Sequence, residues 1–443
     1  MKKLLLLSLL LTISLCSLFS AGAKETSVTE ITFWHSNSGI LGEAIEDLVD
    51  NFNDSVGKEK NIFVTAIYQG KASDVLTKVK AVSQSGDKSE YPSLVQLDAT
   101  GVVDMAANSD LLYIEDLFKA NGDDLSFLLD HAKESMMYKN RVIGLPFNAS
   151  TILYYYNKTL FDKAGVKEIK TLDDLINAAD KLCQKDENGK IVTYAISSVP
   201  TTYEMCAFIG SQKGGSYLTD MDNGHLGFAT KTVFKEEGTL KAFLEKWAEL
   251  YKTGGLKNST SGVTTEFVSG QTASMFASTS NLTTVINAID GRFELGVSYL
   301  PMVNEEATGG VNLGGGALFT FDQDENTSKA VYEFMKYLTS AESQLTWHIK
   351  TGYLPVNKDT YNLDEFKTHC EQNPEFKVAS DQLLASNPKV VGLWIPNGYE
   401  VYYAFQSNIK AMLEENISIE ETVDKMTNEI DRGLDAFNRQ NLN

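Results

Sequence analysis

The chain has 443 residues, 43% of them hydrophobic, so it can bury a large core. Its length predicts about two or three domains, with one elaborate α/β unit as the alternative. Its 39 basic and 59 acidic residues give a formal net charge of −20, which argues against holding nucleic acid or an anionic membrane surface through the overall electrostatic field. We therefore expect a protein of an aqueous compartment that binds no nucleic acid.

The first 23 residues, MKKLLLLSLLLTISLCSLFSAGA, have the pattern of a secretory signal peptide, with a basic start, an apolar run and small residues at the end. Cleavage is expected after Ala23. The apolar run is too short to span a bilayer, and no other stretch approaches the roughly 20 apolar residues of a transmembrane helix. We expect export to the periplasm or the outer face of the cytoplasmic membrane. Cys16 leaves a lipid anchor open, although Leu15 before it is bulkier than lipoprotein processing favours.

Strands and helices alternate over the first part of the mature chain. Strands are predicted over 31–35, 62–68 and 93–97, and apolar residues at helical spacing predict helices over 40–52 and 75–82. This order implies right-handed crossovers and a mainly parallel sheet covered on both faces. The loops after the strands then gather along one edge, where open α/β sheets bind ligands. Trp34 and His35 end the first strand at this edge, either as ligand contacts or as packing residues beneath the cleft.

A second α/β region begins with the β-prone run 152–156, and helical stretches follow near 172–183 and 238–252. The run 297–303 is expected to return the chain toward the first region. The glycine-rich segment 309–321 opens into an apolar strand rather than a helix, so it favours close approach of bare backbone to a ligand or another strand. No low-complexity linker separates the two regions, and we therefore expect two lobes joined by several extended crossings.

The last third of the chain carries helix start and stop signals. Thr339 and Glu342 have capping-box spacing, and Gly352 is a natural helix stop. Tyr353 follows on a segment that a nearby proline makes non-helical, either facing a ligand or packing in the interior. Ser418 starts the last helix with the same capping spacing, and the apolar face of that helix is structural.

Motifs of catalysis are absent from the sequence. It has no GxSxG, HExxH, GxxxxGK[ST] or GxGxxG motif, and its five histidines lack metal-ligand spacing. The carboxylates cannot be paired by sequence, so a secreted hydrolase is unsupported rather than excluded. Three cysteines follow the predicted signal peptide: Cys183, Cys206 and Cys370. One disulfide can form among them. The sequence has no CxxC motif, so it does not indicate a metal or redox site. We predict no catalytic residue, no metal and no cofactor.

Five segments carry a resemblance that covers essentially the whole mature chain. They are FWHSNSGILG at 33–42, PFNASTILYYYNK at 146–158, FASTSNL at 276–282, GGGALF at 314–319 and WHIKTGYLPVNK at 347–358. In their order and spacing, the chain resembles the family-one extracellular solute-binding proteins of bacterial ABC importers, and most of all the glycerol-3-phosphate-binding members of that family.

The resemblance implies two α/β lobes, each a mainly parallel sheet flanked by helices, that close on one solute and present it to a membrane permease and its ATPase. It implies an N-terminal lobe of residues 24–149 plus 302–352 and a C-terminal lobe of residues 150–301 plus 353–443. Crossings between the lobes are expected near 147–151, 300–303 and 351–355. A monomer without enzymatic activity is expected.

The family's ligand contacts carry over only in part. The matching positions are Ser150, Ser278, Gly315 and Tyr353. At the other positions this sequence departs from the family. Ala72 stands where a tyrosine is expected, Ala99, beside Asp98, where an acidic residue is expected, and Tyr402 at or close to the position of a phosphate-facing arginine. The family's two tryptophans fall near Val199 and Thr202, close to Tyr203. The second set of candidate contacts is therefore Trp34, His35, Asp98, Tyr203 and Tyr402.

The absence of the family's phosphate-facing arginine affects which class of solute the chain is expected to bind. A guanidinium holds a phosphate through a charge-assisted, bidentate fork, which is far stronger than a tyrosine hydroxyl. Glycerol-3-phosphate, a glycerophosphodiester and a sugar are all expected solutes, and a neutral sugar or oligosaccharide in place of any phosphate ester is the alternative. An exported adhesin is a further alternative, and it would have no enclosed cleft.

Overall fold

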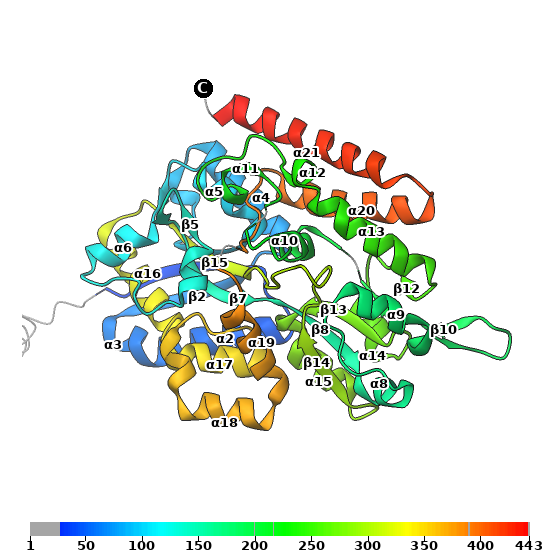
Figure 1. The fold of residues 1–443 in the computed structure, drawn as a ribbon. Helices are drawn as coiled ribbons and strands as arrows, with labels where there is room; N and C mark the ends of the chain where they lie inside the picture. The colour runs from blue at the N-terminus through cyan, green and yellow to red at the C-terminus, as the bar shows by residue number, and fades with distance from the viewer. Residues whose placement is uncertain (1–26, 199, 216, 389, 442–443) are drawn as a thin grey trace, which may run out of the picture.

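Two α/β lobes lie next to each other, and the chain passes between them more than once (Figure 1). The computed structural model describes residues 27–198, 200–215, 217–388 and 390–441. The predicted signal peptide, residues 1–23, and Cys16 within it lie outside these residues. In the described part of the chain, no helix combines the length and the apolar character needed to cross a membrane.

The first lobe is built on a six-stranded sheet of order β2-β1-β3-β15-β4, in which β7 also pairs with β15. Its strands are β1 (Thr29–His35), β2 (Ile62–Tyr68), β3 (Leu94–Asp98), β4 (Leu111–Leu112), β7 (Leu145–Ser150) and β15 (Gly314–Phe321). The main helices around it are α2 (Ile40–Phe52), α4 (Ala72–Ser85), α5 (Val102–Ala106), α6 (Ile114–Ala120), α7 (Asp130–Glu134), α16 (Glu325–Leu338) and α17 (Ala341–Thr351). A short hairpin, β5 (Met137–Tyr138) and β6 (Arg141–Val142), precedes β7.

The second lobe has a five-stranded sheet of order β12-β11-β13-β8-β14. Its strands are β8 (Ile152–Asn157), β11 (Ile196–Ser197), β12 (Leu256–Lys257), β13 (Ser274–Ser278) and β14 (Leu295–Tyr299). Its main helices are α8 (Lys158–Ala164), α9 (Leu172–Leu182), α10 (Thr202–Gly210), α13 (Thr239–Lys252), α14 (Val263–Val268), α15 (Leu282–Ile289), α19 (Pro374–Ala385), α20 (Gly398–Glu414) and α21 (Ile419–Asn441). The helix α18 (Asp364–Gln372) joins α17 to α19.

The prediction of a two-lobed α/β fold is confirmed. Each sheet has a parallel part, β2-β1-β3 in the first lobe and β12-β11-β13 in the second. The parallel part is smaller than expected, because the chain enters each sheet from the other lobe as an antiparallel strand. These strands are β15 in the first lobe and β8 in the second, and β7, by which the chain leaves the first lobe, pairs with β15.

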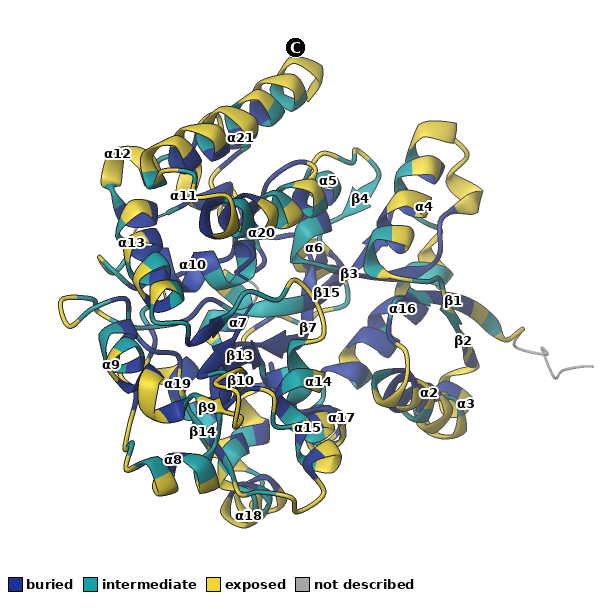
Figure 2. Cartoon of the chain, turned by 90° about the vertical axis from the view of Figure 1, so that its right-hand side faces the viewer, coloured by how far each residue is buried: buried dark blue, intermediate teal, exposed yellow. Residues whose placement is uncertain are grey.

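The buried residues form the inner faces of both sheets and the helix faces that cover them (Figure 2). In the first lobe, Phe334 of α16 meets Phe33 of β1 and Phe52 of α2 edge-on, with ring centroids 5.8 and 5.0 Å apart. Edge-to-face contacts between buried rings stabilise such a core in addition to the stabilisation that comes from burying their apolar surface. The predicted elements at 31–35, 40–52, 62–68 and 93–97 correspond to β1, α2, β2 and β3.

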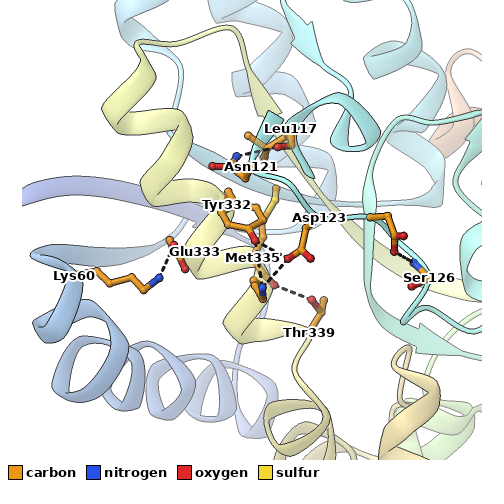
Figure 3. A network of polar contacts seen from close by, with 11 residues as sticks. Lys60, Leu117, Asn121, Asp123, Ser126, Tyr332, Glu333, Met335 and Thr339 are labelled. Carbon is orange, nitrogen blue, oxygen red and sulfur yellow. Dashed lines mark hydrogen bonds and ion pairs between the residues drawn. The ribbon is translucent and has the colours of Figure 1, made fainter. Parts of the chain in front are cut away.

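Polar contacts fix the outer face of α16 to the rest of the first lobe (Figure 3). Asp123 accepts hydrogen bonds of 2.6 Å from the Tyr332 hydroxyl and from the Lys336 ammonium group. These two donors hold the pKa of Asp123 below its ordinary value, with the lysine as the larger cause. Glu333 on the same helix pairs with Lys60 at 2.6 Å. Such exposed pairs contribute at most about 1 kcal/mol each, so they orient α16 more than they stabilise it.

Two of the three helix signals in the last third of the chain are confirmed. Gly352 ends α17 in the left-handed conformation with φ 83°, and Ser418 caps α21 by accepting the Glu421 N–H at 3.1 Å. The cap predicted at Thr339 is wrong. Ser340 caps α17 instead, because the Thr339 hydroxyl already donates to the Met335 carbonyl of the preceding helix at 2.8 Å.

Three segments cross between the lobes. Thr151 separates β7 from β8, and Leu354 donates to the Ala149 carbonyl at 2.7 Å, so the third crossing lies against the first. The second crossing is short, because Val311 still donates to Ser386 of the second lobe at 3.0 Å and Gly314 already begins β15. We propose the lobe boundaries given above, with the second boundary moved toward Asn312.

Candidate functional site

A cavity of about 160 Å³ lies where the two lobes meet the crossings. The first lobe contributes the turn after β3 and the glycine backbone at the start of β15, and the second crossing contributes Asn312 and Leu313. The second lobe contributes the start of α10 and part of α20. The lining residues are Asp98, Ala99, Thr100, Thr202, Tyr203, Cys206, Asn312, Leu313, Gly314, Gly315, Gly392, Leu393 and Tyr402. This is the carboxyl-terminal edge of a parallel strand, where α/β sheets bind ligands.

Asp98 forms the wall of the first lobe. One of its carboxylate oxygens accepts the Thr100 backbone N–H at 3.1 Å and also the Thr100 hydroxyl. The other oxygen accepts the Tyr399 hydroxyl at 2.7 Å. Burial raises the pKa of Asp98, and the hydrogen bonds from Thr100 and Tyr399 oppose that rise.

Tyr203 forms the wall of the second lobe. It lies in the first turn of α10, which begins at a capping box between Thr201 and Glu204. The Tyr203 hydroxyl lies 3.2 Å from the Ser150 Oγ, and the Ser278 side chain also lies near it. Burial raises the pKa of the phenol against the smaller, lowering effects of these two serines, so the phenol stays a neutral donor and acceptor at every physiological pH.

Two glycines make the floor of the cavity. Gly315 has φ 104°, and a Cβ at this position would overlap the Asn148 carbonyl oxygen of β7. A Cβ at Gly314 would overlap the ring of Tyr203. The backbone of the glycine-rich segment therefore lies close to β7 on one side and to the Tyr203 ring on the other. This is the close approach that the sequence predicts for this segment.

A buried chain of amide side chains leads from the first strand to Tyr353. Asn37 donates to the Gln96 Oε1 at 2.7 Å, and Gln96 donates to the Asn148 Oδ1 at 2.9 Å. Tyr353, on the third crossing, lies beside Asn148 and Ser280, whose side chains oppose the rise of its pKa that burial causes. Buried polar networks of this kind fix one geometry, because an unpaired member is costly.

The structure brings most of the sequence-predicted contacts together. Asp98, Gly315, Tyr203 and Tyr402 line the cavity, and Ser150 and Ser278 lie near the Tyr203 hydroxyl. Tyr353 is 9% exposed and lies beside the end of the amide chain. Of the positions where the family residues are replaced, Ala99 and Thr202 line the cavity, Ala72 begins α4, and Val199 lies outside the described residues.

Trp34 and His35 do not line this cavity. His35 is 4% exposed, and burial lowers its pKa below the ordinary value, against a smaller opposing effect of the Asn37 backbone. Its ring lies 5.6 Å from Phe33 and 6.1 Å from Tyr68, centroid to centroid. The structure thus places His35 in the packing beneath the sheet edge, the second of the two interpretations of this stretch.

Tyr399, which binds Asp98, is one of the residues at the site that the sequence reasoning missed, and the cavity-lining Thr100, Cys206, Asn312 and Leu393 are others. Tyr399 stands one helical turn before Tyr402, and the i, i+3 spacing on one helix face is the signal that would have found it.

Among the described residues that line the cavity, none is lysine or arginine. Arg141 pairs with Asp116 at 2.6 Å in the first lobe. The described part of the chain also holds no group of three or more His, Cys, Asp or Glu placed to bind a metal ion, and Cys183, Cys206 and Cys370 are free thiols. The cavity offers hydroxyls, one carboxylate, backbone groups and aromatic faces, which suit a small polar molecule.

Comparison with protein families matches residues 47–377 to the model described as bacterial extracellular solute-binding protein. The chain is 30% identical over 391 residues to the sn-glycerol-3-phosphate-binding periplasmic protein UgpB of Yersinia pseudotuberculosis, which covers 85% of this chain and 84% of that protein. It is 28% identical over 385 residues to UgpB of Pectobacterium atrosepticum, at 84% and 83% coverage.

Solved structures show the same fold. UgpB from Mycobacterium tuberculosis in complex with glycerophosphocholine has a TM-score of 0.75 at 22% identity, over 92% of this chain and 98% of that chain. The sugar-binding protein MalE from Xanthomonas citri has a TM-score of 0.74 at 18% identity, over 93% and 98%. The fold is thus common to proteins whose named solutes differ, glycerophosphocholine in one and a sugar in the other.

Proposed function

The chain belongs to the bacterial extracellular solute-binding protein family and is the solute-binding component of an ABC importer. We propose that its solute is a small polar molecule, namely glycerol-3-phosphate, a glycerophosphodiester or a sugar, held between the lobes. The solutes named for its relatives, glycerol-3-phosphate, glycerophosphocholine and sugars, are of this kind. The solute is delivered unchanged to the membrane permease, which works with an ATPase.

The observation that carries this proposal is the cavity itself. Its walls come from both lobes, and its polar groups are the Asp98 carboxylate and the hydroxyls of Thr100, Thr202, Tyr203 and Tyr402. Hydroxyls and backbone groups match the alternating donors and acceptors of a polyol or sugar, and aromatic faces match its C–H surface. A phosphate ester in this cavity takes its donors from hydroxyls and backbone amides rather than from a guanidinium fork.

The proposed ligand contacts are Ser150, Ser278, Gly315 and Tyr353, with Asp98, Tyr203 and Tyr402 as the second set. Supporting this choice, Ser150 and Ser278 both lie near the hydroxyl of Tyr203, which lines the cavity. We also propose that the protein acts as a monomer without enzymatic activity. Residues 1–23 direct its export, after which it is either free in the periplasm or attached to the outer face of the cytoplasmic membrane by a lipid on Cys16.

Isothermal titration calorimetry with four solutes tests the proposal: sn-glycerol-3-phosphate, glycerophosphocholine, glycerol and maltose. At least one should bind with 1:1 stoichiometry and raise the melting temperature, as expected for a ligand that binds only the folded state. Nuclear magnetic resonance of the recovered solute should show it unchanged. Failure of all four, together with no small molecule released on denaturing the natively expressed protein, would refute the proposal, and turnover of the solute would indicate the hydrolase alternative.

A further inference from the structure

The first turn of α20 docks on the turn after β3, and these two segments belong to different lobes. The Tyr399 hydroxyl donates to the Asp98 Oδ2 at 2.7 Å, across 301 residues of sequence. The other Asp98 oxygen is bound by the Thr100 N–H at 3.1 Å. Both carboxylate oxygens are therefore satisfied within the protein when the lobes are together.

Gly398 allows this approach. A Cβ at residue 398 would lie 2.8 Å from the Thr100 carbonyl oxygen and 2.9 Å from the Thr100 Cβ, closer than side-chain carbons come to such atoms. Tyr402 lies one turn further along α20 and lines the cavity. Because α20 is one rigid helix, docking of its first turn on Thr100 also brings the Tyr402 ring to the cavity.

We infer that Gly398 and Tyr399 form a closure latch with Asp98 and Thr100, which holds the lobes shut around the solute. Tyr399 is not among the residues that line the cavity, so it is a positioning residue and not a ligand contact. The inference rests on the proposed function in one respect, that closure captures the solute. It gives Asp98 a second role, in lobe closure, beside its place among the proposed ligand contacts.

A latch of this kind changes the affinity for every solute by the same factor. It shifts the equilibrium between open and closed lobes, and the apparent dissociation constant varies inversely with the closed fraction. A direct ligand contact would instead change the affinity for one class of solute and spare another. This difference separates the two roles.

The test compares Tyr399→Phe and Gly398→Ala with Tyr403→Phe as the matched control. Tyr403 lies on the same helix and is 59% exposed. Tyr399→Phe should raise the dissociation constant of each solute that binds by about tenfold, which corresponds to about 1.4 kcal/mol, and Gly398→Ala should act in the same direction. Tyr403→Phe should leave each constant unchanged. A loss confined to one class of solute would overturn the inference.

Small-angle X-ray scattering without solute gives the second readout, which does not depend on the proposed function. Tyr399→Phe and Gly398→Ala should have a larger radius of gyration than the wild type and Tyr403→Phe, at unchanged circular dichroism. Equal radii in all four proteins would overturn the latch even if no solute is found. If Gly398→Ala does not fold, the comparison of Tyr399→Phe with Tyr403→Phe decides alone.

Discussion

The Tyr203 hydroxyl lies 3.2 Å from the Ser150 Oγ, and this contact joins the helix that forms one wall of the cavity to the strand that enters the first crossing. The Tyr203 ring lies against Gly314, where there is no room for a side chain. The position of the ring is thus fixed from two sides, by a hydrogen bond at its end and by bare backbone along its face.

Gly314→Ala should weaken solute binding without unfolding the protein. The new methyl group would overlap the Tyr203 ring, which can turn aside into the cavity at the expense of its contact with Ser150. We expect affinity to fall by at least about tenfold, or about 1.4 kcal/mol, in calorimetric titrations. Gly433→Ala is the control, because no atom lies within 4 Å of a Cβ placed there. Equal affinities of the two variants would show that the ring need not lie on bare backbone.

Gly315→Ala should destabilise the first lobe. Its φ of 104° costs a residue with a side chain about 1–3 kcal/mol, and the Cβ would also overlap the Asn148 carbonyl oxygen, so β15 and β7 cannot pair as they do. Gly291→Ala is the control for backbone conformation alone, since it has φ 71° and open space around its Cβ. In urea denaturation, Gly315→Ala should lose clearly more free energy of unfolding than Gly291→Ala. A loss of the same size in both would mean that the close approach to β7 is unimportant.

The order of elements and the two-lobed architecture could be predicted from the sequence, because they follow from local signals. Periodicity of two and of 3.6 residues gives β1, α2, β2 and β3, and the missing linker gives the extended crossings. The antiparallel β15 and β8 could not be predicted, since their direction depends on how the crossing chain enters the other sheet.

The candidate site could be predicted only where one residue suffices to mark it. Gly315 stands at a position that matches the family, whereas Tyr203 and Tyr402 stand at or beside positions where the family residue is replaced, and all three line the cavity. Tyr399 and the Asn37–Gln96–Asn148 chain owe their roles to partners that lie 52 to 301 residues away. No pattern along the chain encodes such pairs, and for the same reason Trp34 and His35 gave a plausible motif that does not line the cavity.

Acid should destabilise the protein through two buried histidines. Burial lowers the pKa of His225 and of His348 to about 4, although carbonyl oxygens of Gly392, Met137 and Tyr353 oppose the shift. A depressed pKa gives stability that is present above the ordinary value of 6.5 and is lost as the pH falls toward 4. The loss approaches about 3 kcal/mol for each histidine at 1.36 kcal/mol per pH unit.

Urea denaturation at pH 7, 5.5 and 4.5 measures this loss. His225→Gln and His348→Gln should each flatten the decline between pH 6.5 and 4.5, because glutamine carries no titrating group. A wild-type free energy of unfolding that stays constant over this range would contradict the prediction, as would variants that decline as steeply as the wild type.

Asp98→Asn separates the hydrogen bond of the latch from its charge. Burial raises the pKa of Asp98, so the folded protein binds this proton more tightly than the unfolded chain does. The stability that Asp98 contributes is therefore complete below its ordinary pKa of 3.8 and is lost as the pH rises through the raised value. Asparagine keeps an oxygen for Thr100 and an N–H for the Tyr399 oxygen but has no charge to desolvate.

Asp98→Asn should thus be more stable than the wild type at pH 7, and the difference should shrink as the pH falls toward 4. Asn also keeps the hydrogen bonds that hold the lobes together. Without solute, the radius of gyration of Asp98→Asn should therefore stay that of the wild type, in contrast to the increase expected for Tyr399→Phe. Urea denaturation from pH 4 to 7 and small-angle X-ray scattering at pH 7 measure the two quantities. A variant less stable than the wild type at pH 7 would mean that the Asp98 charge itself holds the lobes together. The free-energy cost of desolvating the carboxylate would then be smaller than the free energy gained from its hydrogen bonds with Thr100 and Tyr399.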